Sequence, residues 1–219
     1  YPGDTFYLQA QLMERAGQLT PALGGGSMTF LPVCETQQED VTGYIPSNLI
    51  SMTDGQIYLS SRLFYEGSRP AVDVGLSVSR IGTRVQPPAL RAVSADLRLE
   101  LLQYRERRRL TRFSTSMPSA VLKRLRRGER LRALMMQPAH QPVSLEDQTL
   151  MFYVAKSDWL DRLTEEGLAL CRAGIGGRLP SEISDTLRGG EPCDAAFYAK
   201  LDDALQTFLQ PYCRDPKEP

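Results

Sequence analysis

Histidine and clustered cysteine are scarce in this chain of 219 residues, and their scarcity excludes two kinds of site. The only histidine is His140, and the four cysteines stand apart at Cys34, Cys171, Cys193 and Cys213, with no C-x-x-C pair. Zinc sites and disulfide scaffolds need grouped ligands or regularly spaced cysteines. Neither is therefore predicted, and free thiols in a reducing compartment fit the pattern better.

The chain also lacks a Walker A motif. That motif reads G-x-x-x-x-G-K-[ST], because its lysine neutralises phosphates that backbone amides cradle. No lysine of this chain follows a glycine; the four are Lys123, Lys156, Lys200 and Lys217. The run Gly24-Gly25-Gly26 is therefore interpreted as a helix stop and a flexible turn.

No apolar run reaches the roughly 18–20 residues of a spanning helix, so we expect a soluble chain without direct membrane insertion. Lysine plus arginine equal aspartate plus glutamate at 26 each, which gives no overall reason to invoke nucleic acid. The balance conceals a basic stretch over residues 105–132, where Glu106 and Glu129 alone oppose many arginines. Little aromatic interleaving favours a solvated helical face or a surface for acidic partners over a nucleic-acid patch.

Groupings typical of a self-sufficient enzyme are missing as well. The adjacent carboxylates Glu165-Glu166 and Asp202-Asp203 point in different directions on a helix and do not form an acid/base pair. No Ser/His/Asp or Cys/His arrangement stands out. We therefore expect a chain that is not catalytic in isolation.

The hydrophobic pattern changes near residues 84–90. Before that point helix and strand signals alternate, as in α/β layers. The expected elements there are a helix over 4–19, strands over 28–36, 56–59 and 72–78, and a helical turn over 60–66. Beyond it the expected helices are 89–112, 120–136, 145–155, 158–170 and 195–209, with a Gly/Pro-rich passage over 174–192. We predict an α/β piece over 1–88 and an all-α domain over 89–219.

The segment 67–82 holds the most informative residue. It reads as a loop with Arg69-Pro70, then an apolar strand, then Arg80 just beyond the strand end. The planar guanidinium holds several donors in fixed geometry and suits a developing phosphoryl charge. An arginine at this kind of position is more often an ordinary ion-pairing residue.

Five segments in fixed order resemble the F-type rotary ATP synthase alpha subunit. They are YPGDTFYLQAQLMERAG, GGGSMTFLPVCETQ, GYIPSNLISMTDGQIYL, LFYEGSRPAVDVGLSVSRIG and LRLELLQYRE. The catalytic beta subunit instead has Tyr-Pro before the strand and D-P-L-D-S-T-S-R after it, so Arg69-Pro70 and VGLSVSR favour alpha. The resemblance covers only the C-terminal part of such a subunit and weakens beyond about Gln148. It implies the C-terminal half of a RecA-like P-loop nucleotide-binding domain followed by an α-helical bundle domain.

The resemblance also implies roles for five residues. Arg80 matches the arginine that reaches in trans to the γ-phosphate of ATP in the neighbouring beta site, and Ser51 lies near the same phosphate. Arg69, Pro70 and Gln137 match positions around the adenine of a non-catalytic nucleotide, ATP or ADP with Mg²⁺. No metal ligand is implied within this chain.

Some positions depart from the family pattern. Asp73 stands where alpha subunits usually carry asparagine, and Ala139 replaces a family glutamine at the adenine pocket. Residues 113–120, with Met117 and Pro118, replace a segment in which acidic residues are common.

The implied function is a non-catalytic contribution to rotary, proton-driven ATP synthesis, with a nucleic-acid-binding or scaffold module as the alternative. Implied partners are beta subunits, the gamma shaft, the peripheral stalk and an N-terminal alpha fragment carrying the P-loop. Because Tyr1 lies mid-domain without a preceding Met, we expect a split or cleaved subunit. The LFYEG segment suggests the matrix side of the mitochondrial inner membrane, with the plastid thylakoid as the alternative location.

Overall fold

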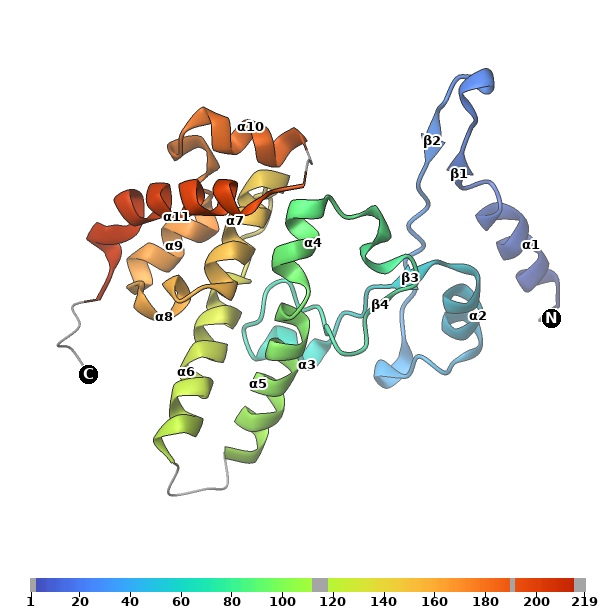
Figure 1. Cartoon of the computed structure of the whole chain (residues 1–219). Coiled ribbons are helices and arrows are strands. Elements are labelled where there is room, and N and C mark those ends of the chain that lie inside the picture. The colour runs from blue at the N-terminus through green and yellow to red at the C-terminus, as the bar shows by residue number, and fades with distance from the viewer. Residues whose placement is uncertain (1–2, 112–117, 190–191, 215–219) are drawn as a thin grey trace. The chain divides into compact units, whose positions relative to one another are not determined.

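The computed structural model describes residues 3–111, 118–189 and 192–214. These residues form two compact units, shown within Figure 1. Unit 1 comprises 1–67 and 71–82, and unit 2 comprises 68–70 and 83–219. Within the described ranges no helix is both long and apolar enough to cross a membrane.

Unit 1 is built from short helices joined by long extended segments. Its helices are α1 (Gly3–Met13), η1 (Pro21–Leu23), η2 (Gln37–Glu39), α2 (Tyr44–Met52) and α3 (Ser61–Tyr65). The first helix packs on α2 through stacked rings of Phe6 and Tyr44, with centroids 4.5 Å apart. The Asn48 side-chain amide also donates to Gln9 Oε1 at 2.7 Å. The predicted helix over 4–19 therefore ends early, at Met13, and the chain turns into a strand.

Two antiparallel strand pairs complete unit 1. The pairs are β1 (Gly17–Gln18) with β2 (Ser27–Met28), and β3 (Gly55–Gln56) with β4 (Val78–Ser79). Gly55 stands opposite Ser79, and a Cβ atom at Gly55 would lie 2.3 Å from the Val78 carbonyl oxygen. Only glycine permits this close backbone approach, which explains the Asp54-Gly55 sequence before β3.

The prediction of a buried strand over 28–36 is wrong. Beyond β2 the segment has no strand assignment, and Leu31 and Val33 are 80% and 97% exposed. A strand is stable only when a neighbour satisfies its backbone groups. Among the described residues, only β1 pairs with this segment, and it does so at Ser27–Met28 alone.

The predicted strand over 72–78 is also wrong for most of its length. Val72 forms a single bridge with Leu59, after which the chain turns. The Asp73 carboxylate causes the turn, because its Oδ1 accepts hydrogen bonds from the amides of Gly75 (2.8 Å) and Leu76 (3.3 Å). Regular pairing resumes only at β4.

Unit 2 is a bundle of helices. They are α4 (Pro88–Ser94), α5 (Leu97–Thr111), α6 (Ser119–Leu134), α7 (Leu145–Lys156), α8 (Trp159–Arg162), α9 (Glu165–Ala173), α10 (Ser181–Gly189) and α11 (Ala195–Leu209). Three short 3₁₀ turns accompany them: η3 (Gly82–Val85) precedes α4, η4 (Gly176–Arg178) lies between α9 and α10, and η5 (Gln210–Tyr212) follows α11. The expected helices over 120–136, 145–155 and 195–209 are present as α6, α7 and α11. The expected helix over 89–112 is instead divided into α4 and α5, and that over 158–170 into α8 and α9. The sequence pattern missed α10, because it lies within the Gly/Pro-rich passage.

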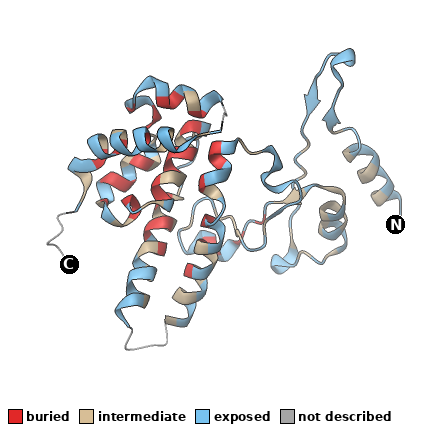
Figure 2. Ribbon diagram, in the orientation of Figure 1, coloured by how far each residue is buried: buried red, intermediate tan, exposed pale blue. Residues whose placement is uncertain are grey.

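The core of unit 2 surrounds α7. Leu150 and Val154 on this helix are fully buried, as are Leu160 and Leu205 on elements beside it. Figure 2 shows buried residues concentrated on α7 and on the helices beside it. Burial of several whole leucine side chains, at about 1.5–3 kcal/mol each, gives unit 2 its own hydrophobic stabilisation.

The helices α5 and α6 form an antiparallel hairpin, seen side by side in Figure 1. They approach closely at one point, where Gly128 faces the Tyr104 ring. A Cβ atom at Gly128 would lie 2.4 Å from Tyr104 Cδ2, so any larger residue would force the helices apart. Leu101 and Leu131 are buried one turn further into the bundle. The opposite end of the hairpin carries few buried residues (Figure 2).

Candidate functional site

Arg80 and Ser51, predicted as neighbours at a phosphate site, come together in unit 1. The Arg80 guanidinium donates through Nη1 to the Ser51 carbonyl oxygen and through Nη2 to the Ile50 carbonyl oxygen, both at 3.1 Å. The Ser51 hydroxyl itself donates to the Asn48 carbonyl oxygen at 2.7 Å. The structure thus joins these two residues through the backbone of Ser51 and not through its side chain.

The β3–β4 pair fixes the position of Arg80. Its backbone amide donates to the Asp54 carbonyl oxygen at 2.7 Å, immediately before β3. Since α2 ends at Met52, the pairing at Gly55 sets Arg80 directly beside the last turn of that helix. The short β3–β4 pairing thus brings Arg80 next to Asp54, although 25 residues separate the two in the sequence.

The end of α2 supplies a favourable electrostatic environment for this cation. The last carbonyl groups of a helix lack partners within the helix and carry partial negative charge. The guanidinium satisfies two of them. Among the described residues no carboxylate pairs with Arg80, which is exposed. The alternative expectation of an ordinary ion pair therefore has no support in the described part of the chain.

The three residues predicted to surround adenine come together in unit 2. The Gln137 amide donates to the Arg69 carbonyl oxygen at 2.9 Å, which sets Arg69-Pro70 against the end of α6. The Arg69–Pro70 peptide bond is cis. The Gln137 side-chain nitrogen, Nε2, donates to the Gln141 carbonyl oxygen at 2.8 Å. The Gln137 side-chain oxygen, Oε1, can then act as a hydrogen-bond acceptor.

This backbone contact places Gln137 next to Arg69 and Pro70, the three positions that the resemblance assigns to adenine. The described residues contain no glycine–lysine loop for phosphates. They also contain no group of three or more His, Cys, Asp or Glu residues that could hold a metal ion.

Sequence reasoning missed the role of Glu39. Its Oε1 accepts hydrogen bonds from the Ser61 amide (2.8 Å) and the Ser60 hydroxyl (3.2 Å), at the start of α3. Its backbone carbonyl accepts from the buried Tyr58 hydroxyl at 2.9 Å. A carboxylate at a helix N-terminus is stabilising, so Glu39 anchors its loop onto α3. An isolated glutamate in a polar loop gives no sequence signal for this.

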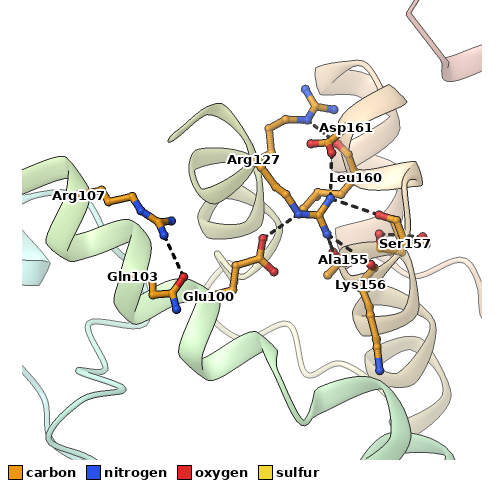
Figure 3. A network of polar contacts seen from close by, with 11 residues as sticks. Glu100, Gln103, Arg107, Arg127, Ala155, Lys156, Ser157, Leu160 and Asp161 are labelled. Atoms are coloured by element: carbon orange, nitrogen blue, oxygen red, sulfur yellow. Dashed lines mark hydrogen bonds and ion pairs between the residues drawn. The ribbon is translucent and has the colours of Figure 1, made fainter. Parts of the chain in front are cut away.

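Sequence reasoning also missed Arg127, the centre of the network in Figure 3. Its Nε pairs with Glu100 at 2.7 Å and its Nη1 with Asp161 at 3.0 Å. Its Nη2 donates to the Ala155 carbonyl oxygen at 2.8 Å, at the end of α7. Burial alone lowers the pKa of Arg127, but the two carboxylates outweigh burial and raise it. Within the basic stretch, this arginine is structural.

Comparison with known proteins relates both units to one family. Residues 1–79 match the model for the ATP synthase alpha/beta family, nucleotide-binding domain, and residues 86–208 match the model for the ATP synthase alpha/beta chain, C terminal domain. The chain belongs to the ATP synthase alpha/beta family. The predicted fold class, part of a nucleotide-binding domain followed by a helical domain, is confirmed.

Similar proteins are named ATP synthase subunit alpha. That of Caldanaerobacter subterraneus subsp. tengcongensis is 51% identical over 97% of this chain and 42% of its own length. Those of Latilactobacillus sakei and Petrotoga mobilis are 44% and 41% identical, over 96% and 95% of this chain. The predicted resemblance to alpha is confirmed, and this chain spans about two fifths of the length of these relatives.

The expected location is wrong. These relatives come from bacteria, which contain neither mitochondria nor plastids. The expectation of the mitochondrial inner membrane, with the plastid thylakoid as the alternative, rested on LFYEG. Those residues belong to α3 and the turn after it, where Arg62 pairs with Glu66, and this local helix carries no information about compartment.

Proposed function

We propose that this chain acts as the C-terminal portion of a non-catalytic ATP synthase alpha subunit, which lends Arg80 to the catalytic site of a neighbouring beta subunit. The observation that carries the proposal is the Arg80 guanidinium, fixed at the end of α2 by two carbonyl acceptors and without a carboxylate partner among the described residues. A cation held this way has its charge available for a substrate.

The proposed role depends on which oxygen atoms bind the Arg80 guanidinium more strongly. Neutral carbonyl oxygens bind a guanidinium less strongly than phosphate oxygens, which form charge-assisted and often bidentate hydrogen bonds. A γ-phosphoryl group placed at this surface would therefore replace one or both carbonyls as acceptor. An arginine supplied in trans stabilises the charge of the phosphoryl-transfer transition state and contributes roughly 10³–10⁵ in rate. In this scheme Ser51 positions Arg80 through its carbonyl group.

Arg69, Pro70 and Gln137 support a second part of the proposal, the adenine end of a non-catalytic nucleotide. The Gln137 Oε1 acceptor suits the adenine amine, and the Pro70 ring suits an adenine face. The nucleotide, ATP or ADP with Mg²⁺, would have its phosphates held by the P-loop portion of the alpha subunit. Ala139 is exposed beside this site and offers no hydrogen bond to the base.

The proposed partners are the beta subunits, the rest of the alpha subunit, the gamma shaft and the peripheral stalk. The bacterial relatives are named as one subunit of an ATP synthase, which supports assembly with other subunits of that complex. For a bacterial complex the corresponding location is the cytoplasmic face of the plasma membrane, where proton-driven rotation would drive ATP synthesis.

The role of Arg80 is tested in the complete complex by Arg80→Ala and Arg80→Lys. We expect multisite ATP turnover to fall by about 10³-fold or more, while nucleotide binding and subunit assembly are retained. Lysine should rescue little, because it lacks the planar fork. The readout is steady-state ATP hydrolysis, with subunit stoichiometry measured on the same sample.

Arg62→Ala is the matched control, since Arg62 is an exposed arginine of unit 1 whose partner is Glu66, at 3.0 Å. It should leave turnover unchanged. Turnover near wild type in Arg80→Ala, in a complex of normal composition, would falsify the proposed role.

A further inference from the structure

The α5–α6 hairpin carries a concentration of positive charge that Arg80 and the adenine site do not use. Its two helices contain eleven arginines and lysines and three glutamates. One of those glutamates, Glu100, is already paired with Arg127. Since the whole chain is neutral, the remainder carries a matching acidic excess. The charge is therefore segregated onto this hairpin.

Part of this charge is unpartnered. Arg109 on α5 and Lys123, Arg124 and Arg126 on α6 are exposed. In the ranges that the structure describes, none of these four side chains has a hydrogen bond or an ion pair with the chain. In contrast, the Arg127 and Arg130 side chains point into the bundle and donate to its carbonyl groups. The basic stretch thus divides into inward, structural arginines and an outward, unpaired set.

Exposed leucines lie among these cations. Leu110 is 63% exposed and Leu122 is 43% exposed. The contact of Tyr104 with Gly128 sets the register of the antiparallel helices. With an equal rise per residue, Leu110 then lies level with Leu122, and Arg109 level with Lys123. The outer half of the hairpin is therefore both basic and apolar.

We propose that this hairpin surface, defined by Arg109, Leu110, Leu122, Lys123 and Arg126, docks an acidic amphipathic helix of a protein partner. Carboxylates of the partner would pair with the cations, and its apolar residues would cover the two leucines. Charge complementarity sets the sign of the partner, and the exposed leucines set its amphipathic character.

The same observations disfavour a nucleic acid. Phosphate contacts use cations but have no need of leucines, and single strands bind through stacking of bases on aromatic rings. The only aromatic residue in the described helices of the hairpin is Tyr104, which is 4% exposed against Gly128. No stacking platform is therefore offered on these helices.

The test uses the full chain and a labelled synthetic helix that repeats Glu-Glu-Leu-Leu-Glu-Glu-Leu. Binding is followed by fluorescence anisotropy at low and at raised salt. We expect salt-sensitive binding that weakens about tenfold in the triple variant Arg109→Gln, Lys123→Gln, Arg126→Gln, as three exposed ion pairs are lost. Leu110→Gln with Leu122→Gln should also weaken it several-fold.

A matched control removes the same three charges elsewhere, as Arg15→Gln, Arg84→Gln and Lys200→Gln, all exposed positions outside the hairpin. This control should bind the peptide like wild type. Two further probes are the peptide with glutamine in place of glutamate and a poly-uridylate strand. Both should bind at least tenfold more weakly than the acidic peptide.

Three results would overturn the inference. One is equal loss of peptide binding in the two triple variants, which would show a non-local effect of charge. A second is tighter binding of the polynucleotide than of the peptide, which would assign the surface to nucleic acid. A third is a dimer in sedimentation that disappears in the hairpin triple variant, which would assign it to a second copy of the chain.

Discussion

Unit 1 and unit 2 differ in how they are stabilised. Of the buried apolar side chains in the described part of the chain, only Tyr58 and Leu63 belong to unit 1, whereas unit 2 buries leucines on nearly every helix. Unit 1 leaves Leu31, Val33 and many other large apolar residues exposed. A unit with so few buried apolar side chains needs other protein surface to cover its exposed apolar residues. Unit 2 is stabilised by its own core and does not need such cover.

Two arginines show the same difference at single-residue scale. Arg80 in unit 1 and Arg127 in unit 2 both donate to carbonyl groups at the end of a helix. Arg127 also has two carboxylate partners, Glu100 and Asp161, and is half-buried. Arg80 is exposed and has neither carboxylate nor cover among the described residues. The same kind of contact, between an arginine and the carbonyl groups that end a helix, is therefore part of the packed interior in unit 2. In unit 1 it leaves the Arg80 charge available for a ligand.

The largest predicted effect tests the contrast in cores. Leu150→Ala should lower the free energy of unfolding of unit 2 by about 3 kcal/mol, because it opens a cavity at a fully buried position. Leu31→Ala, the same change at an exposed position of unit 1, should change the free energy of unfolding of unit 1, measured by amide hydrogen exchange in that unit, by less than about 0.5 kcal/mol. Trp159, the only tryptophan, is buried in α8 and reports unfolding by fluorescence in denaturant.

Hydrogen exchange completes this comparison. Amides of α7 should be strongly protected, and those around Leu31 should exchange rapidly, since no ladder partner holds them among the described residues. Strong protection at Leu31, or a loss of stability in Leu31→Ala equal to that of Leu150→Ala, would contradict the view that unit 1 lacks a core there.

A smaller effect is expected for Arg127→Met, which keeps the apolar stem and removes the donors. It should cost unit 2 about 2 kcal/mol, since Glu100, Asp161 and the carbonyl groups ending α7 lose a charged partner in a half-buried site. Arg124→Met, three residues earlier on α6 and unpaired, is the control and should be nearly neutral. Trp159 fluorescence again gives the midpoints, and equal midpoints would show that the network is not stabilising.

The sequence predicted the two units unequally, and for the same physical reason. Helices satisfy their hydrogen bonds locally, so the pattern of leucines located α6, α7 and α11 within a few residues, although it merged α4 with α5. Strands depend on neighbours from elsewhere in the chain, so the apolar runs over 28–36 and 72–78 did not predict what the described residues form. Helix α10 was hidden by the glycines and prolines around it.

The candidate site shows the same limit. Resemblance paired Ser51 with Arg80 and Arg69 with Gln137. The first pair is in contact through the Arg80 guanidinium and the Ser51 carbonyl oxygen, and the second through backbone atoms. The acceptors of the Arg80 guanidinium could not be read from the sequence, because they are carbonyl groups that any residue provides. The same applies to Arg127, whose role depends on its direction on α6 and not on its type.

The smallest predicted effect compares a buried thiol with an exposed one. Burial raises the pKa of Cys171 to about 12, whereas an unfolded thiol ionises near 8.5. Above about pH 8.5 the unfolded chain therefore binds fewer protons than the folded chain, so stability falls as pH rises toward 12, by at most about 1.4 kcal/mol per pH unit from this group.

Between pH 8.5 and 9.5, Cys171→Ala should reduce this loss of stability by about 1 kcal/mol. Cys34→Ala, at an exposed cysteine of unit 1, should leave the slope of Trp159-monitored stability unchanged. An unchanged slope in Cys171→Ala would mean that the thiol reaches solvent, and that the core of unit 2 is more open at α9 than its packing indicates.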